Sequence, residues 1–321
     1  MRKIAVLTSG GDAPGMNAAI RAVTRYAIYK GLEVYGIERG YTGLINCEIR
    51  QLDRRSVSDI VQRGGTILKT SRSEEFQHVE YQKIAADNLE AYGIEGVVVI
   101  GGDGSYRGAK DLSDNCGIVT VGVPGTIDND LAYTDYTLGF DTAVNTALSA
   151  INNLRDTMTS HERVCIVEVM GRKCGDIALY AGLCGGAEVI LVPEVKSDIS
   201  QVARSIAINK RKGKSSDIIV LAEGFCRAGD LKEQLRANGI NSSIKTTELG
   251  YIQRGGAPTM QDRVLAAQFG VRAVDVLIEG KGSRVVGIRN NAIIDMDTTE
   301  ALAIPRKFNQ DLYNCANILG Q

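Results

Sequence analysis

The sequence is poor in several residue types and patterns, and each scarcity excludes a class of protein. Its 321 residues include no Trp, 5 Pro and 2 His, and aromatic residues make up only 5%. The seven Cys are scattered without any C-x-x-C pair, which argues against a disulfide framework and a zinc motif and predicts reduced core thiols. No apolar run approaches the ~18 residues that span a membrane, and the first run ends at Thr8, too short for a signal peptide. We therefore expect a soluble, cytoplasmic protein.

The chain also has no excess charge of either sign. It holds 37 Lys and Arg against 38 Asp and Glu, a formal net charge of −1, so no basic surplus is available for a nucleic-acid backbone or an anionic membrane. Apolar residues at 44% and charged residues at 23% are typical of a globular protein. At ~150 residues per domain, the length predicts two domains or one large one. The abundant glycine, 36 residues, suggests many tight strand-to-helix turns of the kind that bind phosphates.

Short apolar runs alternate with helical patterns along the chain. Runs that predict strands occupy residues 4–7, 97–100, 118–123, 164–169, 189–192, 218–222 and 285–288. Because they are continuous rather than alternating, they suit parallel strands buried on both faces. Helical periodicity covers residues 16–30 and 141–155, and the second helix could begin with a cap from Asp141. We predict an α/β fold with ligands at the carboxyl ends of parallel strands and a domain boundary near residues 138–141.

Two loops that follow predicted strands carry residues suited to phosphate chemistry. In Gly101–Ser105 the glycines allow a phosphate to approach closely, and Asp103 can hold the magnesium that accompanies a nucleotide. This loop fails the dinucleotide fingerprint because position 107 is Arg, and a tight turn with an incidental Asp is the alternative. In Gly125–Asp130 two carboxylates lie two residues apart, which suits a general base beside a metal or, equally, an Asx-turn.

Several cations stand in or beside polar loops. Bidentate guanidinium groups suit phosphate oxygens, although any single loop cation is more often a solvated surface charge. The candidates are Arg72, Arg163, Arg172, Lys245 and Arg254. A second anion site, or a plain helix surface, could form from Arg21 and Arg25, which share a helix face, together with Arg54 and Arg55. Glycine loops, an acid for magnesium, a carboxylate base and arginines together predict phosphoryl transfer, in which a protein positions reactants and neutralises charge.

Five segments, in order along the chain, resemble the motifs of the bacterial ATP-dependent 6-phosphofructokinase family. They are Gly10–Asn17, Gly101–Ser105, Pro124–Asp130, Met170–Arg172 and Gly250–Gly256. The resemblance implies two doubly wound Rossmann-like domains with largely parallel sheets and an active site in the cleft between them. It implies an ATP-binding domain of residues 1–139 and 257–305, and a sugar-phosphate-binding domain of residues 140–256 and 306–321. The implied reaction is phosphoryl transfer from Mg-ATP to the 1-hydroxyl of fructose 6-phosphate, the committed step of glycolysis.

The resemblance also implies a role for each matching residue. ATP would be held by Gly11, Arg72, Ser73, Gly102, Asp103, Gly104 and Ser105, with Asp103 on magnesium. Asp128 would accept the proton of the sugar hydroxyl, and the other implied catalytic residues are Gly11, Arg72, Thr126, Asp130 and Arg172. The sugar phosphate would be bound by Thr126, Ile127, Asp128, Arg163, Met170, Gly171, Arg172, Glu223, Lys245, Tyr251, Ile252, Gln253 and Arg254.

The resemblance further implies a regulated homotetramer. A neighbouring subunit would supply Arg163 and Lys245 to each sugar-phosphate site. ADP or phosphoenolpyruvate would bind as an allosteric effector between subunits. The matching effector positions are Arg21, Ala22, Val23, Thr24, Arg25, Arg54, Ser58, Asp59, Arg155, Gly186, Ala187, Glu188, Lys212, Lys214, Ser215 and Ser216.

Four positions bear on the substrates. The family's pyrophosphate-dependent members usually carry Asp and Lys where this chain has Gly104 and Gly125, so ATP is the expected donor. The family usually has Arg and His where this chain has Lys245 and Tyr251, which implies a weaker 6-phosphate site or a different sugar phosphate. A pyrophosphate-dependent or altered-sugar kinase and a catalytically idle nucleotide sensor therefore remain alternatives.

Overall fold

The computed structural model describes residues 1–320, which form two compact units built from interleaved segments. Unit 1 comprises Met1–Ile127, Leu131–Thr142 and Arg254–Arg306, and unit 2 comprises Asp128–Asp130, Ala143–Gln253 and the chain from Lys307. The polypeptide therefore passes from one unit to the other five times. These repeated crossings explain why the sequence contains no linker-like stretch between two halves.

Unit 1 is built on a seven-stranded sheet of order β11-β10-β5-β4-β1-β2-β3. The strands are β1 (Lys3–Thr8), β2 (Glu33–Ile37), β3 (Ile49–Leu52), β4 (Gly96–Gly101), β5 (Val119–Pro124), β10 (Arg284–Arg289) and β11 (Ala292–Asp297). The five inner strands are parallel, while the edge strands β3 and β11 pair antiparallel with their neighbours. Their apolar side chains are buried because helices cover both faces of the sheet, as parallel sheets require.

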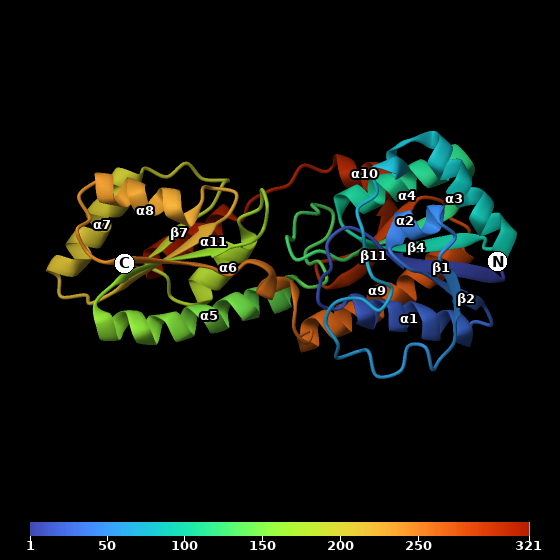
Figure 1. Cartoon of the computed structure of the whole chain (residues 1–321), viewed down its shortest axis with the longest axis horizontal. Coiled ribbons are helices and arrows are strands. Elements are labelled where there is room, and N and C mark those ends of the chain that lie inside the picture. The colour runs from blue at the N-terminus through green and yellow to red at the C-terminus, as the bar shows by residue number, and fades with distance from the viewer. Residues whose placement is uncertain (321) are drawn as a thin grey trace. The chain divides into compact units, whose positions relative to one another are not determined.

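The helices of unit 1 form a layer on each face of this sheet (Figure 1). On one face lie α1 (Met16–Tyr29) and α9 (Met260–Ile278), and on the other lie α2 (Gly40–Ile45), α3 (Val79–Tyr92) and α4 (Asp103–Cys116). Two short helices, η1 (Glu75–Gln77) and α10 (Thr298–Ala303), complete the unit. Helices α1 and α9 approach closely at Gly270, where an added Cβ would lie 2.6 Å from the Cβ of Ala22.

Unit 2 contains a four-stranded, fully parallel sheet of order β7-β8-β6-β9. Its strands are β6 (Val164–Val169), β7 (Val189–Leu191), β8 (Asp217–Ala222) and β9 (Ile244–Glu248). Its helices are α5 (Phe140–His161), α6 (Asp176–Cys184), α7 (Ile199–Arg211), α8 (Ala228–Ala237), α11 (Gln310–Leu319) and the 3₁₀ turn η2 (Gly250–Arg254). In Figure 1, α7 and α8 cover one face of the sheet, while α5 and α6 cover the other. Both units thus have the doubly wound α/β architecture.

All seven strands predicted from apolar runs are present, and both predicted helices are confirmed. The prediction that Asp141 caps the second helix was wrong, because α5 begins at Phe140 and Asp141 lies within its first turn. The N–H groups at this end are bound instead by Asp262 of α9, which accepts from Gly139 at 2.9 Å and from Thr142 at 3.0 Å. A cap supplied from 120 residues away leaves no local signal in the sequence.

The cysteines are only partly buried in the core, where all of them were expected. All seven are free, but only Cys165 and Cys174 are buried. Cys47, Cys184 and Cys315 are exposed, so the expectation was wrong for these three. Within residues 1–320, no helix combines the length and apolarity needed to cross a bilayer.

Candidate functional site

The glycine-acid loop lies at the carboxyl end of β4, against the loop that follows β1. The N–H of Ser9 donates to the carbonyl of Ile100 at 3.0 Å. At Gly101, an added Cβ would lie 2.6 Å from the carbonyl oxygen of Ser9, so only glycine permits this approach of the two backbones. At Gly104, by contrast, an added Cβ would meet nothing within 4 Å. This glycine therefore faces open space beside the loop.

Asp103 stands in the first turn of α4. Its carboxylate is paired with Arg107, one turn along the helix, by contacts of 2.9 and 3.1 Å. Both side chains are about half exposed, so the pair is worth little to stability and is open to exchange with a ligand.

The segment containing Arg72 and Ser73 crosses the same edge of unit 1. The hydroxyl of Thr70 donates to the carbonyl of Gly10 at 2.8 Å, which ties this segment to the loop after β1. Arg72 is exposed and forms no ion pair within residues 1–320. The predicted ATP-binding residues of unit 1 therefore gather around the carboxyl ends of β1 and β4.

Thr126 follows β5, the next strand of the sheet. Its Cβ would lie 3.6 Å from a Cβ added at Gly102, and its carbonyl accepts the hydroxyl of Thr137 at 2.6 Å. Gly125 is packed more tightly than Gly104, because an added Cβ would lie 2.9 Å from Ile100. The start of the Thr126–Asp130 loop thus adjoins the glycine-acid loop.

Arg254 contacts the loop after β1. Its Nη2 lies 2.5 Å from Oδ1 of Asp12, and a Cβ added at Gly11 would lie 3.1 Å from the same nitrogen. Sequence reasoning assigned no role to Asp12, although this residue stands within the Gly10–Asn17 motif. Residues 12 and 254 are 242 positions apart, so only the fold reveals the pair.

In unit 2, Asp128 is paired with Arg172. Nε of Arg172 lies 3.3 Å from Oδ2 of Asp128, whose side chain is 8% exposed, while that of Arg172 is 59% exposed. The carboxylate is thus nearly buried, while its cationic partner is largely exposed. The arrangement brings together the predicted base and one predicted phosphate-binding arginine.

The turn that carries Arg172 has an unusual backbone held by Glu223. Gly171 and Arg172 have φ values of 136° and 53°, both in the left-handed region that non-glycine residues seldom occupy. Oε1 of Glu223 accepts the N–H groups of Gly171 at 3.2 Å and Arg172 at 2.8 Å. Next to this turn, the N–H of Met170 donates to buried Gln253 at 3.3 Å.

The remaining predicted sugar-phosphate cations, Arg163 and Lys245, lie near the amino ends of the parallel strands of unit 2. Arg163 directly precedes β6, and Lys245 pairs in register with Cys165 near the start of β6. The six residues of β6 span about 17 Å, which separates these cations from Met170 and Arg172. Tyr251 and Ile252 are exposed, Tyr251 at 77%. The structure therefore does not bring Arg163 and Lys245 to the Asp128–Arg172 pair of the same unit.

The predicted effector residues form one cluster in each unit. In unit 1, Nη2 of Arg25 donates to the carbonyl of Arg54 at 3.4 Å, whereas Val23 and Thr24 are fully buried. The exposed positions here include Ser58 and Asp59.

In unit 2, nearly buried Glu188 lies 3.2 Å from Arg155 and 2.9 Å from Lys214. Arg155 also donates to the carbonyl of Gly186 at 2.6 Å. Ala187 and Ser216 are buried, while Lys212 and Ser215 are exposed. Two cations thus meet one nearly buried carboxylate, and buried Asp217 is a second acid beside them.

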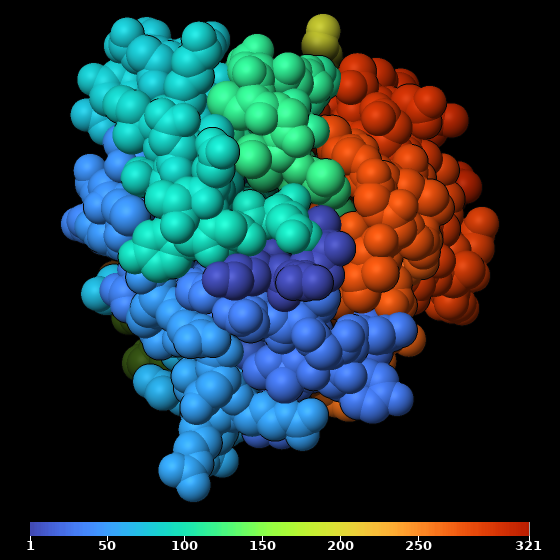
Figure 2. All heavy atoms as spheres, turned by 90° about the vertical axis from the view of Figure 1, so that its right-hand side faces the viewer, coloured from blue at the N-terminus to red at the C-terminus, as the bar shows by residue number. Residues whose placement is uncertain are grey.

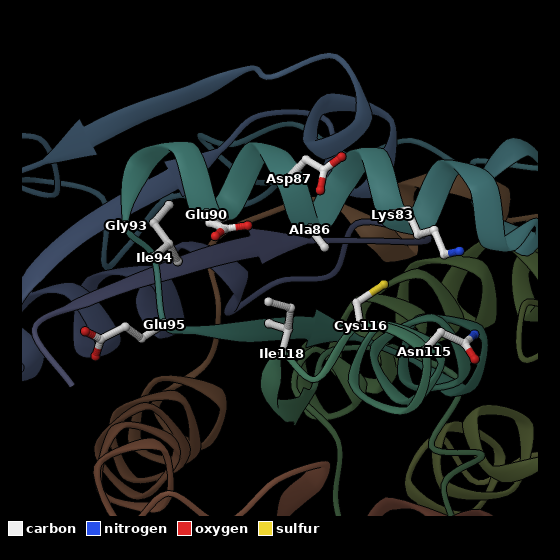
Figure 3. A pocket seen from close by; sticks show the side chains of 10 residues that line it. All are labelled: Lys83, Ala86, Asp87, Glu90, Gly93, Ile94, Glu95, Asn115, Cys116 and Ile118. Carbon is white, nitrogen blue, oxygen red and sulfur yellow. The ribbon is translucent and has the colours of Figure 1, made fainter.

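A separate groove of about 650 Å³ lies in unit 1 between α3 and the end of α4. Figure 2 shows this end of the unit, with α3 in teal beside the end of α4 in green. The side chains of Lys83, Asp87 and Glu90 come from α3, and Cys116 reaches toward them from α4 (Figure 3). Because residues that precede β4 and β5 also line it, the groove lies at the amino ends of these strands. It is therefore not part of the candidate site.

Comparison with known proteins agrees with this geometry. The chain is 61% identical over 320 residues to the "ATP-dependent 6-phosphofructokinase" of Clostridium tetani (strain Massachusetts / E88), covering 99% of each chain. A solved structure of phosphofructokinase from Saccharomyces cerevisiae matches 100% of this chain with a TM-score of 0.88 and 34% identity. The match covers 48% of the yeast chain, so this chain spans about half its length.

The pyrophosphate-dependent phosphofructokinase from Marinobacter aquaeolei shares the fold, with a TM-score of 0.87 and 22% identity over 99% of this chain and 91% of that one. Residues 3–277 match the family described as phosphofructokinase. The chain therefore belongs to the phosphofructokinase family.

Proposed function

We propose that this chain is an ATP-dependent 6-phosphofructokinase that converts fructose 6-phosphate and ATP into fructose 1,6-bisphosphate and ADP. The observation that carries the proposal is the Asp128–Arg172 pair, because a shielded proton acceptor beside an exposed cation suits the activation of a hydroxyl. The name of the 61% identical relative supports the same activity.

In the proposed reaction, Asp128 takes the proton of the sugar 1-hydroxyl as that oxygen bonds to the γ-phosphorus. The bond from this phosphorus to the β-γ bridging oxygen breaks, and ADP leaves with the electron pair. Arg172 is exposed enough to turn from Asp128 toward the transferring oxygens, and Arg72 assists it. Cations that meet negative charge as it develops are a major source of catalysis in phosphoryl transfer.

We further propose that unit 1 binds ATP through Gly11, Arg72, Ser73 and the Gly102–Ser105 loop. The close approach of backbone at Gly101 and the open space at Gly104 support this assignment. Asp103 suits the role of a magnesium ligand, since within residues 1–320 its half-exposed carboxylate is paired with a single exchangeable cation, Arg107. Magnesium bound there would neutralise phosphate charge.

Unit 2 is the proposed sugar-phosphate unit, and the protein is proposed to act as a homotetramer. The length of β6 supports the supply of Arg163 and Lys245 by a neighbouring subunit. Within one unit these residues lie near the amino ends of the strands, whereas Met170 and Arg172 follow the carboxyl end of β6. Arg155 and Lys214 on Glu188, with exposed Lys212 nearby in sequence, support an effector site for an anion such as ADP or phosphoenolpyruvate.

A coupled assay with a panel of donors and acceptors tests the activity. We expect turnover with ATP and fructose 6-phosphate, and we expect Asp128→Asn to lower kcat by ~10²-fold or more with little change in KM. Faster turnover with pyrophosphate would overturn the donor assignment. If ATP binds but no acceptor is phosphorylated, the protein is a nucleotide sensor rather than a kinase.

A further inference from the structure

The loop that carries Asp128 is tied to helix α6 by a residue that the proposed reaction does not use. Asn129 has a φ of 52°, a left-handed conformation that Asn tolerates better than most residues. Its Nδ2 donates to Oδ2 of Asp176 at 3.1 Å. A side chain next to the proposed base is therefore held by a helix 47 residues further along the chain.

The position of Asp176 is fixed by the helix that it begins. It is the first residue of α6, where a carboxylate is favoured by the unpaired N–H groups of the helix. The following residues, Ile177, Ala178 and Leu179, are fully buried, which fixes the start of the helix. The preceding Gly175 donates its N–H to Glu194 at 2.9 Å. A site supported by a packed helix is held more precisely than one supported by a loop.

The same short segment also holds the carboxylate of Asp128. The N–H of Cys174 donates to the carbonyl of Gly171 at 2.8 Å, which closes a turn over residues 171–174 just before α6 begins at Asp176. Arg172, within this turn, contacts Oδ2 of Asp128, and Asp176, two residues beyond the turn, accepts the bond from Asn129. The Asp128 loop is thus fixed at two points by residues 171–176.

We propose that Asp176 is a positioning residue for Asp128, acting through the side chain of Asn129. This inference rests on the proposed kinase function, since it assigns Asp128 the proton-accepting role. Loss of the contact removes one of these two supports and allows Asp128 to shift from its position against the hydroxyl. Small misplacements of reacting groups are costly in rate, up to ~10²-fold for ~1 Å.

The first test compares Asp176→Ala with Asp176→Asn. We expect the Ala variant to lower kcat by ~10-fold or more while KM for both substrates stays within ~2-fold. The Asn variant should retain most activity, because its amide oxygen still accepts the bond from Asn129. Asp230→Ala is the matched control, since Asp230 also stands in the first turn of a unit 2 helix and should leave kcat unchanged.

The second test reverses the polarity of the contact. Asn129→Asp sets two carboxylates against each other and should lower kcat, whereas adding Asp176→Asn restores a carboxylate–amide pair and should recover activity. In an Asp128→Asn background, Asp176→Ala should have no further effect, because the group that it positions is already gone. Equal effects in both backgrounds, or no recovery in the double variant, would overturn the proposal.

A readout without catalysis separates this proposal from the proposed function. Thermal midpoints of wild type, both single variants and the Asn129→Asp, Asp176→Asn double variant form a cycle that reports the contact itself. Inactive wild-type protein with a coupled cycle would refute the kinase function and leave the contact in place. Active wild-type protein with a purely additive cycle would refute the positioning role.

Discussion

Gly104 provides a direct test of how the protein selects its phosphoryl donor. The proposed reason for glycine here is that a carboxylate at this position would repel the α-phosphate of ATP. An added Cβ meets nothing within 4 Å. A negative charge in the first turn of α4 also suits the helix. Gly104→Asp should therefore fold as well as the wild type.

The expected effect is on ATP binding. One unit charge at ~6 Å from another, with an effective dielectric constant of ~20, costs about 3 kcal/mol, or about a hundredfold in affinity. We expect KM for ATP to rise by about that factor, with KM for fructose 6-phosphate unchanged, in a steady-state coupled assay. Gly104→Ala is the control for bulk and should keep the KM for ATP near that of the wild type. An equal loss in both variants would refute the electrostatic argument, and no loss in either would remove Gly104 from the ATP site.

Three other predictions concern the core, pH and the acceptor. Tyr133→Phe removes a hydroxyl oxygen that lies 3.0 Å from Oη of Tyr106 and donates to the carbonyl of Val286 at 2.9 Å. We expect the free energy of unfolding to fall by about 1–3 kcal/mol and Tm to fall by roughly 3–10 °C. Tyr29→Phe, at an exposed position, is the control and should leave Tm unchanged. Burial raises the pKa of Asp262 above its ordinary value of 3.8, so ionising this carboxyl lowers the free energy of unfolding. The stability of wild type relative to Asp262→Asn should therefore fall as pH rises from ~4 toward neutrality. Tm values of the two proteins that keep a constant difference across this range would contradict that reasoning. Lys245→Arg and Tyr251→His should each lower KM for fructose 6-phosphate in the coupled assay, whereas a rise in both would mark the native residues as adaptations.

Elements that are buried on both faces were predictable, because burial leaves a continuous apolar run. Val97–Ile100 of β4 is such a run, and every residue of that strand is buried. In β9 only Ile244 is buried, so its mixed composition resembles that of a loop. The edge strands β3 and β11 were missed for a similar reason, because each is only partly buried. Strand β2 was missed although only Glu33 is exposed, because Gly36 interrupts its short apolar run.

The site was predictable only where its residues cluster in sequence. Glycines and carboxylates within one loop, such as Gly101–Ser105, show their chemistry directly. The supports of the site do not, since they join distant positions. Asp12 meets Arg254, and Asn129 meets Asp176, and nothing in the local composition of either partner indicates the other. A single sequence therefore reveals reacting groups better than it reveals the residues that hold them.

The five crossings between units have a consequence for how the chain folds during synthesis. Nearly all of unit 2 is one continuous segment, residues 143–253, so its sheet can close before the chain is complete. Unit 1 begins first yet must wait, because α9 and the strands β10 and β11 arrive only after residue 260. Until then, the face of α1 that packs on α9 and the edge of β5 that pairs with β10 remain uncovered. The first segment to leave the ribosome thus cannot become native until residues 260–306 follow it, and its exposed strand edge is the point at which misassociation would begin.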